Sequence, residues 1–208
     1  MTTLALFRHG QTDWNIQRRL QGRADVSITS DARQELSKLQ LPNTFSGVRC
    51  RTSPLVRAVE TARCLNVCSF ETDIRLIEMD WGLWEGETIA NLRQELGTEF
   101  VAAEERGLDL KPPEGESPRE VQDRLRPFLK EVAAARETTL AITHKGVIRA
   151  LLSLALNWDL TGAPPFKLDW HSLHLFALNT DGHPQIECLN VPLLTARAHP
   201  YNSEDSED

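Results

Sequence analysis

The sequence has no excess of positive charge and no long hydrophobic run. Its 208 residues include 23 Lys and Arg against 30 Asp and Glu, which gives a formal net charge of −7. Such a chain has no general electrostatic attraction for nucleic acid or for an anionic membrane surface, so we expect neither as a partner. No apolar stretch approaches the length that a bilayer crossing requires, so no membrane span is predicted.

Signals for export and for a cysteine-based metal site are also absent. Residues 1–3 carry no basic side chain and Arg8 interrupts the first apolar run, so no signal peptide is predicted. The four cysteines, at positions 50, 64, 68 and 188, do not form two pairs at zinc-site spacing. We interpret them as structural thiols in a reducing compartment, and we expect a cytoplasmic protein.

The length and composition predict one domain. A chain of 208 residues with 40% hydrophobic residues can build a substantial core, and it contains no internal repeat and no linker. We expect a single domain over residues 1–200, in which residues 86–118 form a lid between two core segments. Residues 203–208 are all Ser, Glu or Asp, so an acidic disordered tail is predicted over 201–208.

The first candidate functional residues follow the apolar run Leu4–Phe7, which predicts a buried strand. Arg8 and His9 stand at the carboxyl end of this strand, and Gly10 allows a tight turn. Ligands of open α/β sheets bind at the carboxyl ends of the strands, and a cation beside an imidazole suits an anion. Taken alone, the tripeptide favours an ordinary turn with a solvated arginine and a surface histidine.

A second strand, predicted over 48–52, leads to another cationic residue. Ser53 and Pro54 after this strand predict a helix start, with Ser53 as the N-cap and Arg57 in the first turn. Arginine near a helix N-terminus opposes the helix dipole, and a bound anion would offset that cost. A solvent-facing helix arginine is the alternative interpretation.

A third apolar strand is predicted over 138–143, directly before His144 and a helix over 147–156.

Glu78 lies between apolar neighbours, an environment that raises a carboxyl pKa by desolvation, although a surface glutamate in a loop is the more ordinary interpretation. The other expected elements are helices over 30–39 (capped by Ser30 or Asp31), 88–106 and 117–135, and strands over 166–168, 172–178 and 185–190.

The alternation of strands and helices predicts a three-layer α/β/α sandwich with a mostly parallel central sheet. Because parallel strands expose their carboxyl ends at one edge, His9, Arg57 and His144 should meet there, beside Arg8. Two arginines and two histidines near helix N-termini suit a dianion such as phosphate. The chain contains no Walker-type glycine loop and no aspartate cluster, so neither a P-loop nor a cofactor or metal is predicted.

Taken together, these segments resemble the histidine phosphatase superfamily, also called the phosphoglycerate mutase-like family. The segments occur in the family's order and cover most of residues 4–156. They are Leu6–Asn15, Thr52–Ala62, Leu76–Glu78 with Trp84–Gly86, Gly115–Ser117 and Thr143–Val147. By size and layout, the chain is most similar to the α-ribazole phosphatase-like group, and the phosphoglycerate mutase-like fold is therefore expected.

The resemblance implies a role for each matching residue. His9 corresponds to the nucleophile that becomes phosphohistidine, and Glu78 to the acid that protonates the leaving oxygen and later activates water. The implied holders of the phosphoryl oxygens are Arg8, Arg57 and His144, and the implied substrate or phosphate contacts are Asn15, Gln21 and Gly22. The implied activity is metal-independent hydrolysis of a small phosphorylated metabolite, because phosphoryl transfer needs positioning and charge stabilisation above all.

Two departures from the family's pattern bear on the reaction. Lys145 stands where a small residue often follows the late histidine, and there it favours a substrate with a second anionic group unless it points to solvent. The segment 89–116 is shorter than that of a cofactor-dependent mutase and lacks its paired arginines. We therefore expect a hydrolase, with a phosphoglycerate mutase or a non-catalytic phosphate-binding or interaction module as alternatives. The apolar strand Leu173–Leu178 suits either the core or an interface, which leaves a homodimer open.

Overall fold

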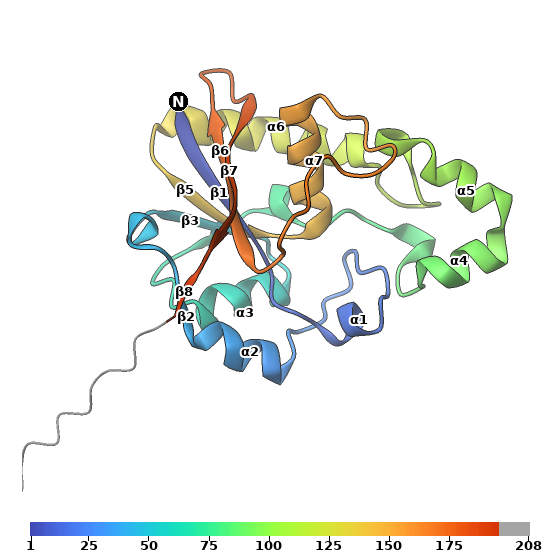
Figure 1. Cartoon of the computed structure of the whole chain (residues 1–208), viewed down its shortest axis with the longest axis horizontal. Helices are drawn as coiled ribbons and strands as arrows, with labels where there is room; N and C mark the ends of the chain where they lie inside the picture. Colours follow the sequence, from blue (N-terminus) through green and yellow to red (C-terminus); the bar gives the residue numbers. More distant parts are fainter. Residues whose placement is uncertain (196–208) are drawn as a thin grey trace, which may run out of the picture.

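The computed structural model describes residues 1–195, which are built around a six-stranded sheet (Figure 1). In spatial order its strands are β4 (Glu71–Thr72), β3 (Arg49–Thr52), β5 (Thr139–Thr143), β1 (Thr2–Arg8), β6 (Ser172–Leu178) and β7 (Pro184–Pro192). The first four are parallel, β6 is antiparallel to β1, and β7 is antiparallel to β6. A separate pair joins β2 (Leu39–Gln40) to β8 (Leu194–Thr195). The acidic tail predicted over 201–208 lies outside the described residues.

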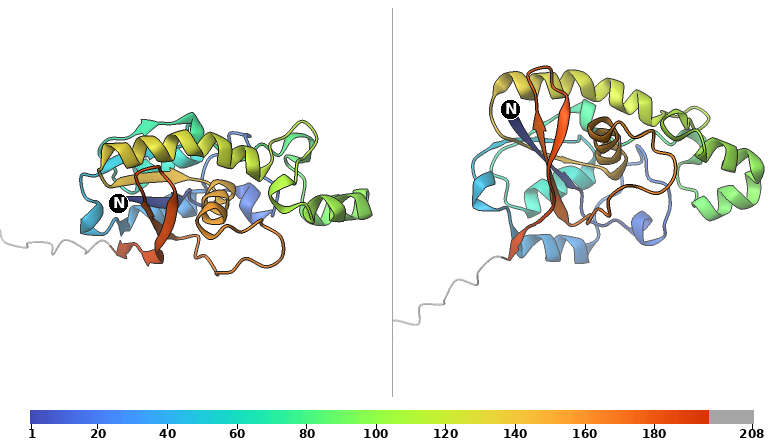
Figure 2. Two further views of the ribbon diagram at one scale, coloured as in Figure 1. Left: turned by 90° about the horizontal axis from the view of Figure 1, so that it is seen from above. Right: turned by 45° about the horizontal axis from the view of Figure 1, so that its top comes forward.

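Helices cover both faces of this sheet, as Figures 1 and 2 show. The covering helices are α2 (Ser30–Ser37) and α3 (Val56–Cys64) on one face, and α6 (Pro118–Ala135) and α7 (Lys145–Leu156) on the other. Leu4 and Leu6 pack in the core beneath α6 and α7, whereas Ala5 and Phe7 pack with α2 and α3. The predicted three-layer sandwich is confirmed. None of the helices in residues 1–195 has the length and apolarity that a membrane crossing requires.

The segment predicted as a lid contains α4 (Ile89–Leu96) and α5 (Thr98–Glu104), which project from the sheet at the right of Figure 1. These two helices have a small core of their own, in which Trp84 and Phe100 meet edge to face at a centroid distance of 5.0 Å. Leu92 is buried beside them. This core keeps the two helices together as one projecting body, called here the α4–α5 unit.

Helix α3 begins later than predicted, and Ser53 is not its N-cap. The N-cap position is Leu55, which provides no side-chain hydrogen bond. The Ser53 N–H instead donates to the carbonyl of Ile142 at 2.9 Å, so Ser53 extends the pairing between β3 and β5. Pairing with a buried neighbouring strand therefore overrides the local capping preference of the Ser-Pro sequence. The Ser53 hydroxyl accepts a hydrogen bond from the Leu55 N–H at 3.3 Å and can still meet a second partner.

Four other expectations are resolved by the structure. The predicted helix 88–106 is interrupted at Gly97, whose φ of +54° ends α4 and is a conformation that glycine tolerates best. The cap of α2 is Thr29 and not Ser30 or Asp31, the two predicted positions. Residues 166–168 form no strand. The apolar strand within β6 lies between β1 and β7, so Leu173–Leu178 contributes to the core.

Candidate active site

The carboxyl ends of three neighbouring parallel strands bring the predicted histidines together. After β1, the His9 N–H donates to the carbonyl of Thr143 at 2.9 Å, which continues the β1–β5 pairing by one residue. Ser53 continues the β3–β5 pairing in the same way. His9 and His144 consequently lie side by side, with ring centroids 5.1 Å apart. The predicted convergence at one edge of the sheet is confirmed for these residues.

His9 is held as a neutral imidazole with one free nitrogen. Its Nδ1 lies 2.7 Å from the carbonyl of Gly10, so Nδ1 carries the proton and donates it, and Nε2 keeps its lone pair. The Gly10 N–H donates to Thr61 Oγ1 at 2.8 Å, which fixes the turn. Burial, assisted by the positive charges of Arg8 and Arg57, lowers the pKa of His9 well below its usual value. A buried, unprotonated imidazole can act as a nucleophile.

Arg57 lies behind His9 and is completely buried. Its terminal nitrogens donate to the carbonyls of Gly22 at 2.7 Å and Ala24 at 2.8 Å, and its Nε donates to His144 Nδ1 at 3.3 Å. Because Nδ1 of His144 accepts, the proton of that ring sits on Nε2, which donates to Ser53 Oγ at 2.7 Å. Hydrogen bonds between the buried side chains of Arg57, His144 and Ser53 therefore join helix α3 to the ends of strands β5 and β3.

The three linked side chains of Arg57, His144 and Ser53 together carry a single positive charge, that of Arg57. Burial lowers the pKa of Arg57 to about 10, although the nearby Glu78 carboxylate opposes that shift. Burial and the charge of Arg57 lower the pKa of His144 well below its usual value, so His144 is neutral. Ser53 was missed by the sequence analysis, which placed it at a helix start. Its contact with His144 spans 91 residues of sequence and has no local signal.

A buried carboxyl group, that of Glu78, lies beside this cluster. Among the described residues that line the pocket in front of His9, it is the one carboxyl group. It is 6% exposed, and burial raises its pKa although two backbone hydrogen bonds and Arg57 favour the ionised form. Those bonds come from the N–H groups of Met79 at 2.9 Å and Gly146 at 3.2 Å. Gly146 permits this approach, because a Cβ at position 146 would overlap Glu78 Oε1. A carboxyl with a raised pKa can donate a proton near neutral pH.

An open pocket of about 480 Å³ lies in front of His9, and we call it the active-site pocket. Its lining residues are Arg8, His9, Gln11, Asn15, Arg18, Arg19, Leu20, Gln21, Glu78, Trp81, Ile89, Lys145, Gly146, Arg149 and Trp170. Two buried donors in this wall, Arg8 Nε and Gln21 Nε2, have no hydrogen-bond partner. Since unpaired buried donors are unfavourable, they indicate a site for an acceptor-rich ligand.

The other predicted contacts are divided between this pocket and the layer behind it. Asn15 Nδ2 donates to Gln21 Oε1 at 3.3 Å, which directs the Gln21 amide nitrogen away from that bond. Lys145 stands at the exposed rim. Gly22, Arg57 and His144 do not line the pocket; they form the layer behind His9.

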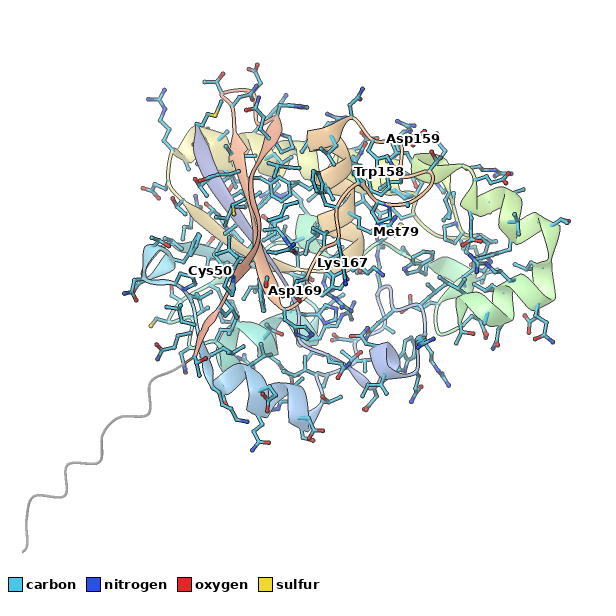
Figure 3. All side chains as sticks on the ribbon, viewed as in Figure 1. Cys50, Met79, Trp158, Asp159, Lys167 and Asp169 are labelled. Carbon is cyan, nitrogen blue, oxygen red and sulfur yellow. The ribbon has the colours of Figure 1, made fainter. Side chains whose placement is uncertain are left out.

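A second pocket of about 530 Å³ adjoins the first and is called here the side pocket. It lies between α7 and the α4–α5 unit, and Met79, which Figure 3 labels, is one of its lining residues. The two pockets share Trp81, Ile89, Gly146 and Arg149 as walls. The sequence analysis named none of these residues, nor Trp170 at the rim, as site residues. Gly146 and Arg149 follow His144 closely on α7, whereas Trp81, Ile89 and Trp170 reach the pockets from other elements by tertiary packing.

The sequence matches the histidine phosphatase superfamily (branch 1) over residues 4–192. The chain belongs to this superfamily. Several solved structures share its architecture: YhfR of Bacillus stearothermophilus superposes with a TM-score of 0.77 at 28% identity, covering 92% of this chain and 98% of that one. A putative alpha-ribazole-5'-P phosphatase of Escherichia coli gives a TM-score of 0.73 at 26% identity, covering 91% and 96%.

Curated relatives with different names match the same region. The chain is 31% identical to the 2,3-bisphosphoglycerate-dependent phosphoglycerate mutase of Bartonella bacilliformis, over 72% of this chain and 79% of that protein. It is 29% identical to phosphoserine phosphatase 1 of Hydrogenobacter thermophilus, over 81% and 83%. It is 27% identical to human 6-phosphofructo-2-kinase/fructose-2,6-bisphosphatase 3 over 99% of its own length, but it spans only 39% of that protein.

Proposed function

We propose that this chain hydrolyses phosphomonoesters through a phosphohistidine intermediate on His9. The observation that carries the proposal is the free Nε2 of a neutral, buried His9 that faces a cationic pocket. In the first step Nε2 forms a bond to phosphorus, and the ester P–O bond breaks as Glu78 protonates the leaving oxygen. In the second step water attacks phosphorus, Glu78 takes the proton of that water, and the P–N bond breaks to release phosphate.

The remaining residues of the cluster stabilise charge in this proposal. Arg8 presents an unpaired buried donor to the phosphoryl oxygens, and the Gln21 amide nitrogen adds a second. Arg57 and His144 act from behind, where Arg57 contributes positive charge and His144 orients it. One well-placed donor stabilises a phosphoryl transition state by about 3 kcal/mol. Because these cations compensate the charge of the phosphoryl group, no metal ion is required, and a chelator should leave activity unchanged.

A mutase is the second candidate, favoured by the similarity to the Bartonella enzyme. Against it, Arg93 of the α4–α5 unit, which lines the side pocket, is already paired with the Glu104 carboxylate at 3.0 Å and 2.9 Å. The same proposal includes the domain organisation: one catalytic domain over residues 1–200 with a lid over 86–118. It also includes a reducing, cytoplasmic location, consistent with cysteines that are all free thiols in the described residues.

The test is a phosphate-release screen of the purified chain against phosphorylated metabolites, with a chelator present and His9→Ala as the control. Release from some compounds, absent with His9→Ala, would support the hydrolase. A coupled assay with 2- and 3-phosphoglycerate tests the alternative, since isomerisation without release of phosphate would establish a mutase. Binding of phosphate without either reaction would leave a non-catalytic binding module.

A further inference from the structure

Among the cations of the active-site pocket that the reacting phosphoryl group does not explain, two lie together on one helix. Lys145 and Arg149 are four residues apart on α7, so they occupy the same face of that helix, and both line the active-site pocket. Arg149 also lines the side pocket. Within residues 1–195, no carboxylate lies at ion-pair distance from either side chain.

This arrangement is unfavourable without an anion. Like charges four residues apart destabilise a helix, and the first turn, where Lys145 lies, disfavours a positive charge. Partial desolvation against the pocket wall and the charges of Arg149 and Arg8 lower the pKa of Lys145. The cations are held by aromatic rings: Lys145 Nζ lies 5.5 Å from the centroid of Trp170, and Arg149 Cζ lies 5.7 Å from that of Trp158.

The charge of the pocket exceeds what one phosphoryl group needs. Five cationic side chains line the pocket and Glu78 is the one acidic side chain among the described lining residues. The cations are Arg8, Arg18, Arg19, Lys145 and Arg149. A phosphoryl dianion is already matched by Arg8 and the buried Arg57 next to His9. The concentration of positive charge is local, because the chain as a whole carries a net charge of −7.

The position of Glu78 shows which part of a substrate the two cations would meet. Glu78 accepts a hydrogen bond from the Gly146 N–H, so the proposed acid for the leaving oxygen lies against the first turn of α7. The leaving alcohol must therefore emerge beside Lys145 and Gly146. From there it can extend past Arg149 into the side pocket of about 530 Å³.

We propose that Lys145 and Arg149 form a second anion site, and that the preferred substrates are phosphomonoesters whose alcohol portion carries a further carboxylate or phosphate. This inference rests on the proposed function for the direction of the leaving group. Lys145 and Arg149 are binding residues in it; they do not take part in bond breaking.

The experiment compares matched probes that differ by one negative charge. A series of ω-phosphooxy carboxylates with two to five carbon atoms is paired with the corresponding primary amides. A second series pairs alkanediol bisphosphates with the monophosphates of the same diols. For each pair, the ratio of kcat/KM values is measured for the wild type, Lys145→Gln, Arg149→Gln and the control Lys130→Gln. Lys130 is an exposed lysine of α6 that lines neither pocket. Intrinsic differences between leaving groups cancel when ratios are compared between variants.

We expect a preference for the charged probe at one or more chain lengths in the wild type and in Lys130→Gln. Lys145→Gln and Arg149→Gln should each reduce that ratio by about 10-fold, because one charge-assisted hydrogen bond contributes about a factor of ten to affinity. Lys145→Arg should restore it. The series with the larger ratio identifies whether a carboxylate or a phosphate is preferred. A ratio that is the same in all variants, at every chain length, would show that the inference is wrong while the hydrolase stands.

Binding separates this inference from the proposed function. The dissociation constants of the same probe pairs are measured by calorimetry with His9→Ala, with and without Lys145→Gln. A charge preference that depends on Lys145, in a chain whose wild type releases no phosphate, would support the anion site and reject the hydrolase. Equal binding of charged and neutral probes to His9→Ala would reject the anion site, whatever the activity.

Discussion

Replacing Gly146 by alanine is expected to displace the proposed acid without changing it. The added Cβ would overlap Glu78 Oε1 and lie 3.2 Å from Glu78 Cδ and 3.5 Å from the Cβ of Met79. The Gly146 N–H is also one of the two backbone donors to that carboxyl, at 3.2 Å. Either the carboxyl turns away from α7, or the first turn of α7 moves away from the carboxyl. Both changes alter the position of Glu78 relative to the leaving oxygen.

The size of the effect follows from the function of an acid catalyst. A general acid contributes about 100-fold to 10,000-fold to the rate, and a displacement of about 1 Å removes about 100-fold. We therefore expect kcat/KM for n-butyl phosphate to fall about 100-fold in Gly146→Ala. p-Nitrophenyl phosphate should lose less than about 5-fold, because its leaving group scarcely needs a proton.

The assay is phosphate release from both substrates, with thermal unfolding as a check on the fold. Gly47→Ala is the matched control, because a Cβ there would meet no atom within 4 Å although φ is +72°. It should lower stability by about 1 kcal/mol through backbone strain and leave the ratio of the two rates unchanged.

Two results would refute the reasoning. Equal losses on both substrates would mean that Gly146 acts through the shape of the pocket and that Glu78 is not the acid for the leaving oxygen. A wild-type rate on n-butyl phosphate, in a folded variant, would mean that the position of the Glu78 carboxyl does not limit the reaction.

Three further predictions concern the same cluster. Glu78→Gln should slow alkyl phosphates about 100-fold or more and p-nitrophenyl phosphate only slightly, and equal losses in steady-state assays would contradict the acid role. In the pH profile of kcat/KM, the lowered pKa of His9 should keep the enzyme active below pH 6.5, since the nucleophile loses its proton at a lower pH than an ordinary histidine. The raised pKa of Glu78 should produce a decline on the alkaline side for alkyl substrates, shifted above the usual range of a carboxyl and absent for p-nitrophenyl phosphate or in Glu78→Gln. Ser53→Ala should lower the free energy of unfolding by about 1–3 kcal/mol, because it leaves the buried His144 N–H without a partner, and unchanged urea denaturation would show that this bond is not needed.

The central layer of the fold and the residues at its strand ends could be predicted from the sequence. A continuous apolar run of strand length predicts a strand that is buried on both faces of a sheet. Two such runs end directly before Arg8–His9 and His144, so these residues are expected at the edge of the sheet. The same local patterns located the helix from 118 to 135, where Ser117 and Glu120 form a complete capping box.

Local patterns failed where a distant partner decided the outcome. The Ser-Pro sequence at position 53 is a strong helix start by itself, but pairing with β5 drew Ser53 into the sheet edge and turned its hydroxyl toward His144. The helix predicted over 88–106 was divided at Gly97, because the α4–α5 unit folds back on its own small core.

The sequence by itself determined which groups are available for catalysis: the imidazole of His9, which can lose its proton, the carboxyl of Glu78 and the arginines. Only the tertiary structure decided their states and the surroundings of the substrate. Burial beside Arg8 and Arg57 makes His9 neutral, and the Gly10 carbonyl selects its free nitrogen. Trp170 reaches the rim beside Arg149 from a segment that follows α7, and no periodicity or spacing encodes a contact of that kind.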